Sequence, residues 1–236
     1  MDLIENAERF IERYCTSSED NQNAQEQSNN EEDNNLDYLD MPITMEEFEA
    51  AIKISKKTSS PGLDQVEYQM LQFLPKPTKE ILLSTINQFL ENNIFPEEWH
   101  EYLVILIPKK SKAKFRPIAL ASCVLKIVER ILNTRLQQYI ESEKLIPNSQ
   151  YGFRKKRSCI SVITILITKI LSTFNDGESL CGVMLDIESA FDNVSPKTLQ
   201  LILNKLKIPK KIKQFINNLM TMRKLYFKVA NNLQGP

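Results

Sequence analysis

The sequence is poor in glycine, histidine and cysteine. Only five of its 236 residues are glycine. This scarcity argues against sandwiches and barrels with many tight turns and favours helices. The single histidine, His100, and four widely spaced cysteines without a CxxC pair exclude a zinc site of the usual ligand spacing. We interpret Cys15, Cys123, Cys159 and Cys181 as free thiols in a reducing compartment.

Long hydrophobic runs are also missing. The most apolar run, residues 160–168, ends at Lys169 and is too short to span a bilayer. The chain begins with acidic residues instead of the basic region that opens a secretory signal peptide. We therefore expect an intracellular protein, nuclear or cytoplasmic, that is not secreted and has no membrane partner.

The formal net charge is zero, but the charges are divided unevenly along the chain. Residues 1–50 contain two basic and fifteen acidic residues, a net charge of −13. Residues 51–236 contain 28 basic and 15 acidic residues, a net charge of +13. This division predicts an acidic leader joined to a basic body that could bind nucleic acid.

The acidic leader covers residues 1–40. Residues 1–15 could form a short amphipathic helix, and the polar residues 16–37, rich in Asn and Gln, predict a disordered linker. An acidic interaction segment is the alternative for this linker. We expect folded structure from about Met41 onward.

The body, residues 41–236, predicts an α+β fold that is rich in helices and has few strands. A capping box at Thr44 and Glu47 opens the first helix, which ends at a turn over residues 59–62. Periodicity and proline positions predict further helices over 66–74, 78–93, 122–142, 158–174, 196–206 and 209–222. Short apolar runs predict strands over 102–107, 180–187 and 225–230, with a basic loop or hairpin tip over 109–116.

Asp186 is the first candidate for chemistry, because it ends an apolar run predicted to be a strand. A carboxylate there is costly to desolvate unless it binds a cation or hydrogen-bond donors. Asp186 and the backbone carbonyl of Ile187 offer hard oxygens to Mg²⁺. Phosphoryl transfer by two metal ions needs at least one more carboxylate from elsewhere. The alternative is that Asp186 only caps the following turn.

Two basic segments are candidates for phosphate binding. In the first, Arg116 precedes a proline and could hold a phosphate through two hydrogen bonds. It is accompanied by Lys109, Lys110, Lys112 and Lys114. The second segment, Gln150–Arg157, interleaves aromatic residues with four cations, which suits stacking on bases and pairing with phosphates. The alternatives are a solvated hairpin for the first and a basic helix cap before Ser158 for the second.

Six motifs in a fixed order resemble one family. They are SSPGLDQV (59–66), W-x₇-IPKK (99–110), FRPIAL (115–120), K-x₂-E-x₅-R (126–135), QYGFR (150–154) and LDIESAFDNV (185–194). Together they resemble the reverse transcriptase, or RNA-directed DNA polymerase, of non-long-terminal-repeat retrotransposons of the long interspersed nuclear element type. The resemblance covers about residues 41–236.

The resemblance implies part of a right-hand polymerase: fingers over about 41–178 and the start of a palm with an incomplete sheet over about 179–236. It implies that Asp186 is catalytic as the first palm metal ligand, with the Ile187 carbonyl beside it. Phe191 would lie under the sugar of the incoming nucleotide and exclude a 2′-hydroxyl. Lys109 and Arg116 would hold its triphosphate.

The resemblance also implies RNA template, DNA primer and dNTP as partners, and Mg²⁺ as cofactor. The residues expected to contact nucleic acid are Gln150, Gly152, Phe153, Arg154, Lys155, Lys156 and Arg157. The residues Ser60, Pro61, Gly62 and Asp64 resemble the amino-terminal fingers motif, a structural and template-facing turn.

The sequence departs from the family pattern in two ways. Ser189 stands where the family commonly has lysine. More seriously, the chain contains no Asp-Asp pair and no PQG motif, which in the family supply and precede the remaining metal ligands. We therefore expect a truncated domain that holds Mg²⁺ weakly or not at all and is inactive alone, although an endonuclease domain before Met1 is plausible. The alternatives are a non-catalytic nucleic-acid-binding or interaction protein derived from a retroelement, and a degenerate product without function.

Overall fold

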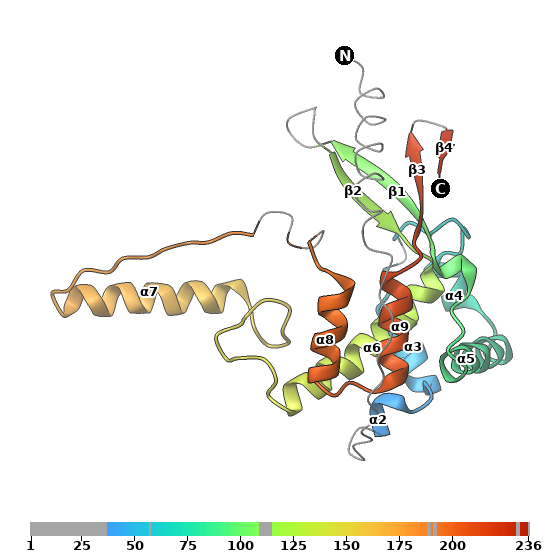
Figure 1. Cartoon of the computed structure of the whole chain (residues 1–236), viewed down its shortest axis with the longest axis horizontal. Helices are drawn as coiled ribbons and strands as arrows, with labels where there is room; N and C mark the ends of the chain where they lie inside the picture. Colours follow the sequence, from blue (N-terminus) through green and yellow to red (C-terminus); the bar gives the residue numbers. More distant parts are fainter. Residues whose placement is uncertain are drawn as a thin grey trace. The chain divides into compact units, whose positions relative to one another are not determined.

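The computed structural model describes residues 37–56, 58–108, 115–187, 190, 193–229 and 232–235. The described helices are α2 (Asp37–Asp40), α3 (Met45–Ile54), α4 (Tyr68–Phe73), α5 (Lys76–Glu91), the 3-10 helix η2 (Glu97–Trp99), α6 (Cys123–Ser142), α7 (Cys159–Asn175), α8 (Pro196–Lys205) and α9 (Lys210–Met220). The strands are β1 (Glu101–Pro108), β2 (Phe115–Leu120), β3 (Lys224–Val229) and β4 (Asn232–Gln234) (Figure 1). The α+β class and the helix-rich character are as predicted.

The chain divides into two compact units. Unit 1 combines residues up to Thr134 with Ser195–Pro236, and unit 2 is Arg135–Val194. The predicted helix over 1–15, most of the predicted linker over 16–37 and the basic residues 109–114 lie outside the described residues. No helix in the part of the chain that the structure describes is long and apolar enough to cross a membrane.

Helix α3 begins at the predicted capping box. The Thr44 side-chain oxygen accepts a hydrogen bond from the Glu47 amide at 3.3 Å, and a Glu47 carboxylate oxygen accepts one from the Thr44 amide at 3.0 Å. These two bonds satisfy amides that have no partner within the helix. Folded structure starts slightly before the expected Met41, because Leu39 in α2 is 1% exposed.

The sheet of unit 1 has four strands in the order β2-β1-β3-β4. Strands β1 and β2 form an antiparallel hairpin, β3 runs parallel to β1, and β4 returns antiparallel to β3. Paired residues share a face of the sheet. Val104 and Phe227 are such a pair and are both buried, so this face is turned toward the core.

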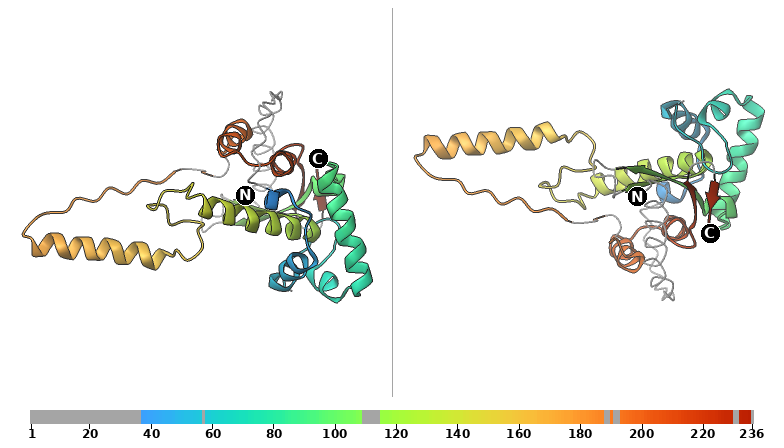
Figure 2. Two further views of the ribbon diagram at one scale, coloured as in Figure 1. Left: turned by 90° about the horizontal axis from the view of Figure 1, so that it is seen from below. Right: turned by 90° about the horizontal axis from the view of Figure 1, so that it is seen from above.

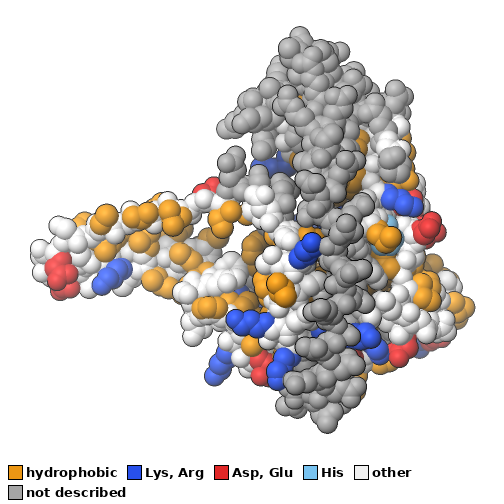
Figure 3. Space-filling model, in the orientation of Figure 1, with side chains coloured by type: hydrophobic (Ala, Val, Ile, Leu, Met, Phe, Trp, Pro, Cys, Tyr) orange, Lys and Arg blue, Asp and Glu red, His pale blue; other side chains and the backbone are white. Residues whose placement is uncertain are grey.

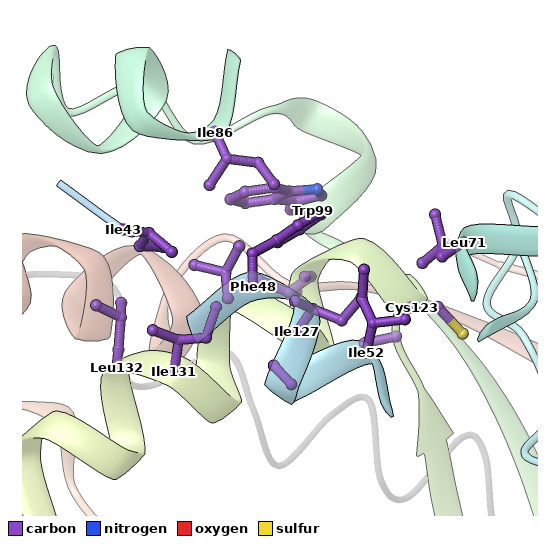
Figure 4. Close-up of a cluster of buried hydrophobic side chains, with 14 of the residues drawn as sticks. Ile43, Phe48, Ile52, Leu71, Ile86, Trp99, Cys123, Ile127, Ile131 and Leu132 are labelled. Atoms are coloured by element: carbon purple, nitrogen blue, oxygen red, sulfur yellow. The ribbon is translucent and has the colours of Figure 1, made fainter. Parts of the chain in front are cut away.

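The core of unit 1 joins helices that are distant in sequence. Figure 4 shows Phe48 from α3 close to Ile127 from α6. Trp99 of η2 and Ile86 of α5 lie above them in this view. Phe48 and Ile127 are fully buried, and burying such a side chain contributes about 1.5–3 kcal/mol. Phe95 and Phe89 extend this cluster by packing edge-on against Trp99, with ring centroids 5.4 and 6.1 Å away.

Helices α8 and α9 lie side by side in unit 1 (Figures 1 and 2). Leu203 of α8 is buried, as are Ile212 and Phe215 of α9. The Lys211 amine is 2.6 Å from a carboxylate oxygen of Glu91, which ties α9 to α5. The helix pair is therefore held by apolar packing, and α9 also by the ion pair between Lys211 and Glu91.

Unit 2 contains α7, which has an exposed apolar surface. Its Ile160, Ile163 and Phe174 side chains are exposed, and Figure 3 shows hydrophobic side chains along this helix. Ser158 caps its first turn, since its side-chain oxygen accepts a hydrogen bond from the Ser161 amide at 3.2 Å. The predicted helix over 158–174 is therefore confirmed.

The predicted strand over 180–187 is wrong. This segment forms an extended stretch without regular secondary structure (Figure 1), pairs with none of the four described strands, and has Leu185 92% exposed. A run of apolar residues favours extended backbone, but a strand also needs a neighbour that completes its hydrogen bonds. No described segment provides that neighbour.

Candidate functional site

The β1–β2 hairpin carries Arg116, the first predicted phosphate ligand. Arg116 pairs with Ile107 across the hairpin, and its side chain is exposed. Ile118, two residues after Arg116 in β2, lies on the same face of the sheet as Arg116. Ile118 pairs with Ile105 of β1, and Ile105 pairs with Lys228 of β3. Arg116 and Lys228 therefore share a sheet face. Lys228 is also exposed. Lys109, the second predicted triphosphate ligand, lies outside the described residues.

Lys228 was not among the predicted site residues. Its place opposite Ile105 depends on a parallel pairing between strands that are about 120 residues apart in sequence, which no local pattern indicates. The only available signal was the alternation of side chains in the predicted strand over 225–230. This alternation places Lys228 on the sheet face opposite to that of the buried Phe227.

The predicted fingers motif packs against the start of α6. Gly62 is buried, and a Cβ atom placed on it would lie 2.8 Å from both the Ala121 carbonyl carbon and the Ser122 amide nitrogen. The turn after Gly62 is held by its own residues, since an Asp64 carboxylate oxygen accepts a hydrogen bond from the Val66 amide at 3.2 Å. The motif therefore has a structural role at the point where β2 leads into α6.

The end of α3 is held by side chains from two other helices. Arg130 of α6 donates to the Ala51 carbonyl at 3.0 Å and to the Ser55 hydroxyl at 2.5 Å. Gln72 of α4 donates to the carbonyls of Ile52 and Ser55. These bonds satisfy carbonyl groups that the helix end leaves without partners. They link the end of α3 to α4 and to α6.

Arg154 is the centre of the second basic segment. Its guanidinium donates to both carboxylate oxygens of Glu141, at 2.8 and 2.7 Å. It also donates to the carbonyls of Pro147 and Gln150, at 2.8 and 3.3 Å. The hydrogen bond from Arg154 lowers the pKa of Glu141, and the bond to Glu141 raises the pKa of Arg154. Arg154 therefore ties the segment to the end of α6.

Arg157 supports the same segment from the other side. It donates to the backbone carbonyl of Asn148 at 2.7 Å and to its side-chain oxygen at 3.0 Å. Its guanidinium carbon lies 4.8 Å from the centre of the Tyr151 ring, within the range of a cation–π contact. We call Arg154 and Arg157, with the groups that they bind, the arginine clamp.

The arginine clamp leaves other residues of the segment open to solvent. Gln150, Gly152, Lys155 and Lys156 are exposed, and the Phe153 side chain is 87% exposed. Phe153 and Lys156 both have a backbone φ of 60°, which residues other than glycine rarely adopt. The structure thus divides the seven predicted nucleic-acid contacts into two internally bonded arginines and five exposed residues.

Glu141, Asn148 and Tyr151 were not among the predicted site residues. Glu141 lies 13 residues before Arg154, and no helical or strand spacing links the two. Tyr151 was within the quoted motif, but its contact with Arg157 depends on how the segment folds back. The structure alone identifies these partners.

Asp186 and Ile187, the predicted metal ligands, lie in the exposed extended segment. Asp186 is exposed, so the expected cost of burying its carboxylate does not arise. Among the described residues no group of three or more His, Cys, Asp or Glu side chains could hold a metal ion. A single exposed carboxylate does not fit a two-metal centre, which needs carboxylates on both ions. Phe191, the predicted residue under the sugar, lies outside the described residues.

Comparison with known proteins assigns these features to a family. Residues 107–235, more than half of the chain, match the family described as reverse transcriptase (RNA-dependent DNA polymerase). This range contains Arg116, the clamped segment and Asp186.

Curated relatives come from transposable elements. The chain is 33% identical over 158 residues to a probable RNA-directed DNA polymerase from transposon BS of Drosophila melanogaster, covering 65% of this chain and 17% of the relative. It is 28% identical over 172 residues to the RNA-directed DNA polymerase from mobile element jockey of the same species, covering 67% and 19%. It is 28% identical over 179 residues to a Pol polyprotein from a type-1 retrotransposable element R2 of Popillia japonica, covering 74% and 24%.

The chain therefore spans less than a quarter of the length of these relatives. The range matched to the family includes β2, the segment over 150–157 and the α8–α9 pair, so the similarity covers residues of both units. From the family match and the transposon relatives together, the chain belongs to the reverse transcriptase family, with the RNA-directed DNA polymerases of non-long-terminal-repeat retrotransposons.

Proposed function

We propose that this chain forms the nucleic-acid-binding fingers, and the beginning of the palm, of a reverse transcriptase that copies retroelement RNA into DNA. The observation that carries the proposal is the exposed part of the segment over 150–157, held in place by the arginine clamp within the range that matches the family. A basic, exposed segment that is held by internal bonds binds a phosphate backbone better than a mobile basic segment does, because it loses less conformational entropy on binding.

The exposed residues of this segment supply the two kinds of contact that single strands favour. Lys155 and Lys156 offer ammonium groups to phosphates, which gives affinity without sequence preference. Phe153, being 87% exposed, offers a ring on which a base can stack. Gln150 and Gly152 lie beside them and permit close approach to template or primer.

For the incoming nucleotide, we assign the phosphate-binding role to the hairpin. Arg116 projects from β2 with an exposed guanidinium that can pair with two phosphate oxygens. Lys109 and Phe191, both outside the described residues, complete the assignment on family resemblance. Lys228, on the same sheet face as Arg116, is an additional cation that favours a triphosphate there.

This family generally uses divalent metal ions. The Asp186 carboxylate and the Ile187 backbone carbonyl would supply two of the oxygen ligands for such an ion. The described residues do not fit a complete centre, so we derive no catalytic step from them. The chain contains no Asp-Asp pair. We therefore propose that these 236 residues by themselves bind nucleic acid without extending a primer.

A second function, non-catalytic nucleic-acid binding by a retroelement-derived protein, is favoured because no metal-binding group of three or more His, Cys, Asp or Glu side chains occurs among the described residues. The two functions share the binding surface and differ in whether Asp186 ever acts. Under the first, Asp186 contributes to polymerisation once the other carboxylates are supplied. Under the second, Asp186→Asn changes nothing that can be measured.

The test is equilibrium binding of a fluorescent single-stranded RNA of about 30 nucleotides to the full chain in EDTA, over a range of salt concentrations. In the double variant Lys155→Gln/Lys156→Asn, asparagine suits the positive φ at position 156. Loss of two phosphate contacts should reduce the slope of log affinity against log salt by about one to two, and weaken binding about tenfold at low salt.

The matched control is Lys53→Gln/Lys76→Gln, which removes the same charge from exposed positions on α3 and α5. Its affinity and salt slope should stay close to those of the unaltered chain. Equal effects of the two double variants would show that binding depends on total charge alone and would exclude the clamped segment as the site.

A further inference from the structure

We infer that residues 1–36, which we call the amino-terminal segment, bind the outer face of the sheet in unit 1 and cover Arg116. The outer face is the side of the sheet opposite to the buried Val104 and Phe227 (Figure 1). The amino-terminal segment lies outside the described residues, so its part in the contact is argued from its sequence. The effect on nucleotide binding rests on the proposed role of Arg116, whereas the docking itself does not.

The outer face is apolar and partly open to solvent. Ile107, Ile118 and Leu233 on this face are 46%, 38% and 54% exposed. A sheet normally buries its apolar face against a second layer of structure. Strand pairing places seven apolar side chains on the outer face: Leu103, Ile105, Ile107, Ile118, Leu120, Tyr226 and Leu233.

The positive charge of the outer face is concentrated at one end. Arg116 pairs with Ile107 and Lys228 pairs with Ile105, so both cations lie toward the tip of the β1–β2 hairpin. Both are exposed, and neither has a hydrogen-bond or ion-pair partner among the described residues. The residues that join the two strands, 109–114, add four lysines by sequence. A partner for this face therefore needs an apolar surface beside negative charge.

The sequence of the amino-terminal segment offers both. Over residues 1–36 there are ten acidic and two basic residues, a net charge of −8. In a helix over 1–15, Glu5, Glu8 and Glu12 would follow one edge of an apolar stripe, because they are three and four residues apart. The stripe would occupy an arc of about 120° and contain Leu3, Ile4, Ala7, Phe10, Ile11 and Tyr14.

The dimensions of the two surfaces agree. A helix of 15 residues is about 22 Å long, and the eight residues of β1 span about 26 Å. Residues 16–36, which would connect this helix to Asp37, can span up to about 70 Å when extended. A connection of this length does not restrict the helix to surfaces near Asp37. Complementarity of the surfaces, more than reach, therefore decides where the segment binds.

Two other occupants fit the outer face less well. A second copy of the chain offers little free negative charge on its own outer face, because Glu101 there pairs with Lys224 across the strands and accepts a hydrogen bond from Tyr226 at 3.2 Å. A nucleic-acid backbone would pair with Arg116 and Lys228 but leave the apolar side chains uncovered. The amino-terminal segment satisfies the apolar part and the charged part together.

Docking of the segment has a consequence for ligand binding. Its carboxylates would pair with Arg116, the residue proposed to hold the incoming triphosphate. Carboxylate and phosphate then compete for one guanidinium, and the apparent affinity for the triphosphate falls with the fraction of chains in which the segment is docked. The segment would thus be an autoinhibitory contact within the chain.

Cys15 provides a natural probe for the docked segment. On the expected helix it lies between the apolar stripe and the edge that carries Glu8 and Glu12. In the full chain, Cys159→Ser and Cys181→Ser remove the two exposed thiols of the described residues, and Cys123 is buried. Cys15 is then the thiol from which a short bismaleimide can start a cross-link.

The test introduces one further cysteine at either of two positions. Ile107→Cys lies on the outer face, and Ile202→Cys on α8 is the matched control, since the two isoleucines are 46% and 48% exposed. Ile118→Cys repeats the test at a second site on the outer face. Peptide mass mapping measures each cross-link, and the yields are divided by the reactivity of each cysteine toward a monofunctional maleimide.

We expect about tenfold more cross-link from Cys15 to position 107 than to position 202, because docking raises the local concentration above that given by the tether alone. Phe10→Ser/Ile11→Ser should lower the yield at position 107 to that at position 202. Equal yields at the two positions would overturn the inference. So would a yield at position 107 that is unchanged by Phe10→Ser/Ile11→Ser.

Two further arms identify the occupant and separate the docking from the proposed function. A mixture of isotopically light and heavy chains shows whether the cross-link joins residues of one chain, and links between chains would overturn the inference in favour of a second copy. Inorganic triphosphate should reduce the yield at position 107. If the selective cross-link forms and triphosphate leaves it unchanged, the docking stands and the proposed nucleotide role of Arg116 fails.

Discussion

Gly62 lies so close to Ala121 that a Cβ atom at position 62 would be 2.8 Å from the Ala121 carbonyl carbon. Ala121 follows the last residue of β2, the strand that carries Arg116. The contact is backbone to backbone, so neither side can move aside by changing a rotamer. The turn over 59–64 thereby sets where β2 ends and α6 begins.

The first prediction concerns this contact. Gly62→Ala should lower the free energy of unfolding by about 1–3 kcal/mol, because the added methyl group overpacks a site lined by backbone atoms. Chemical unfolding followed by the fluorescence of Trp99, the single tryptophan, measures the change. Gly182→Ala is the matched control, because a Cβ atom there meets nothing within 4 Å. A Gly62 variant as stable as this control would contradict the close approach.

The second prediction separates a positioning role of Arg154 from direct contact with phosphate. Because Arg154 acts through Glu141, Arg154→Gln and Glu141→Gln should both expose residues 143–157 to limited proteolysis. Both should also weaken RNA binding by a similar factor, although the second substitution removes no positive charge.

The salt dependence distinguishes the two roles further. A positioning residue changes the affinity and leaves the salt slope nearly unaltered, whereas a phosphate ligand lowers the slope by about one. The contradictory outcome is that Glu141→Gln binds RNA as tightly as the unaltered chain, while Arg154→Gln binds it more weakly. Arg154 would then be a phosphate ligand itself, and the arginine clamp would not position the segment.

Much of the fold could be predicted because its signals are local. The capping box at Thr44 and Glu47 depends on residues three apart, and the apolar run over 102–107 has the length and composition of a strand. Both are confirmed by α3 and β1. Strand β2 was missed because its only local signs are a proline and a basic neighbour, and its strand character comes from pairing with β1.

The error at 180–187 has the same origin. The residues LCGVMLDI favour extended backbone, and the segment is extended, but strand formation needs a pairing partner that local sequence cannot supply. The role of Arg154 was also hidden, because its partners Glu141 and Pro147 come together only when the chain folds back after α6. The sequence indicated which residues carry charge; the folded chain determines which of those charges remain available.

The third prediction uses the cysteines to test burial. Burial raises the pKa of the Cys123 thiol, and the residue is 1% exposed, whereas Cys159 and Cys181 are exposed. Thiolates are the reactive form, so a thiol reagent near neutral pH should modify Cys159 and Cys181 in the native chain and Cys123 only after unfolding. Mass mapping of the modified peptides measures this order, and rapid native labelling of Cys123 would contradict the placement of α6.

The fourth prediction is a pH dependence at high pH. Burial raises the pKa of Tyr102 to about 12, from an ordinary value of 10.0. Because the folded state favours the neutral phenol, its contribution to stability is complete below pH 10 and is lost as the pH rises through about 12. Stability should therefore fall more between pH 10 and 12 in the unaltered chain than in Tyr102→Phe. Identical pH profiles in urea unfolding would contradict this.

The central claim is that this chain binds nucleic acid as part of a reverse transcriptase and that the residues the structure describes hold no complete metal centre. Primer extension tests this claim most directly. The purified chain is incubated with an RNA template, an annealed DNA primer, dNTPs and Mg²⁺, and the unaltered chain is compared with Asp186→Asn. We predict that both proteins shift the hybrid in a binding gel and that neither lengthens the primer. Incorporation of nucleotides by the unaltered chain that disappears in Asp186→Asn would contradict the account.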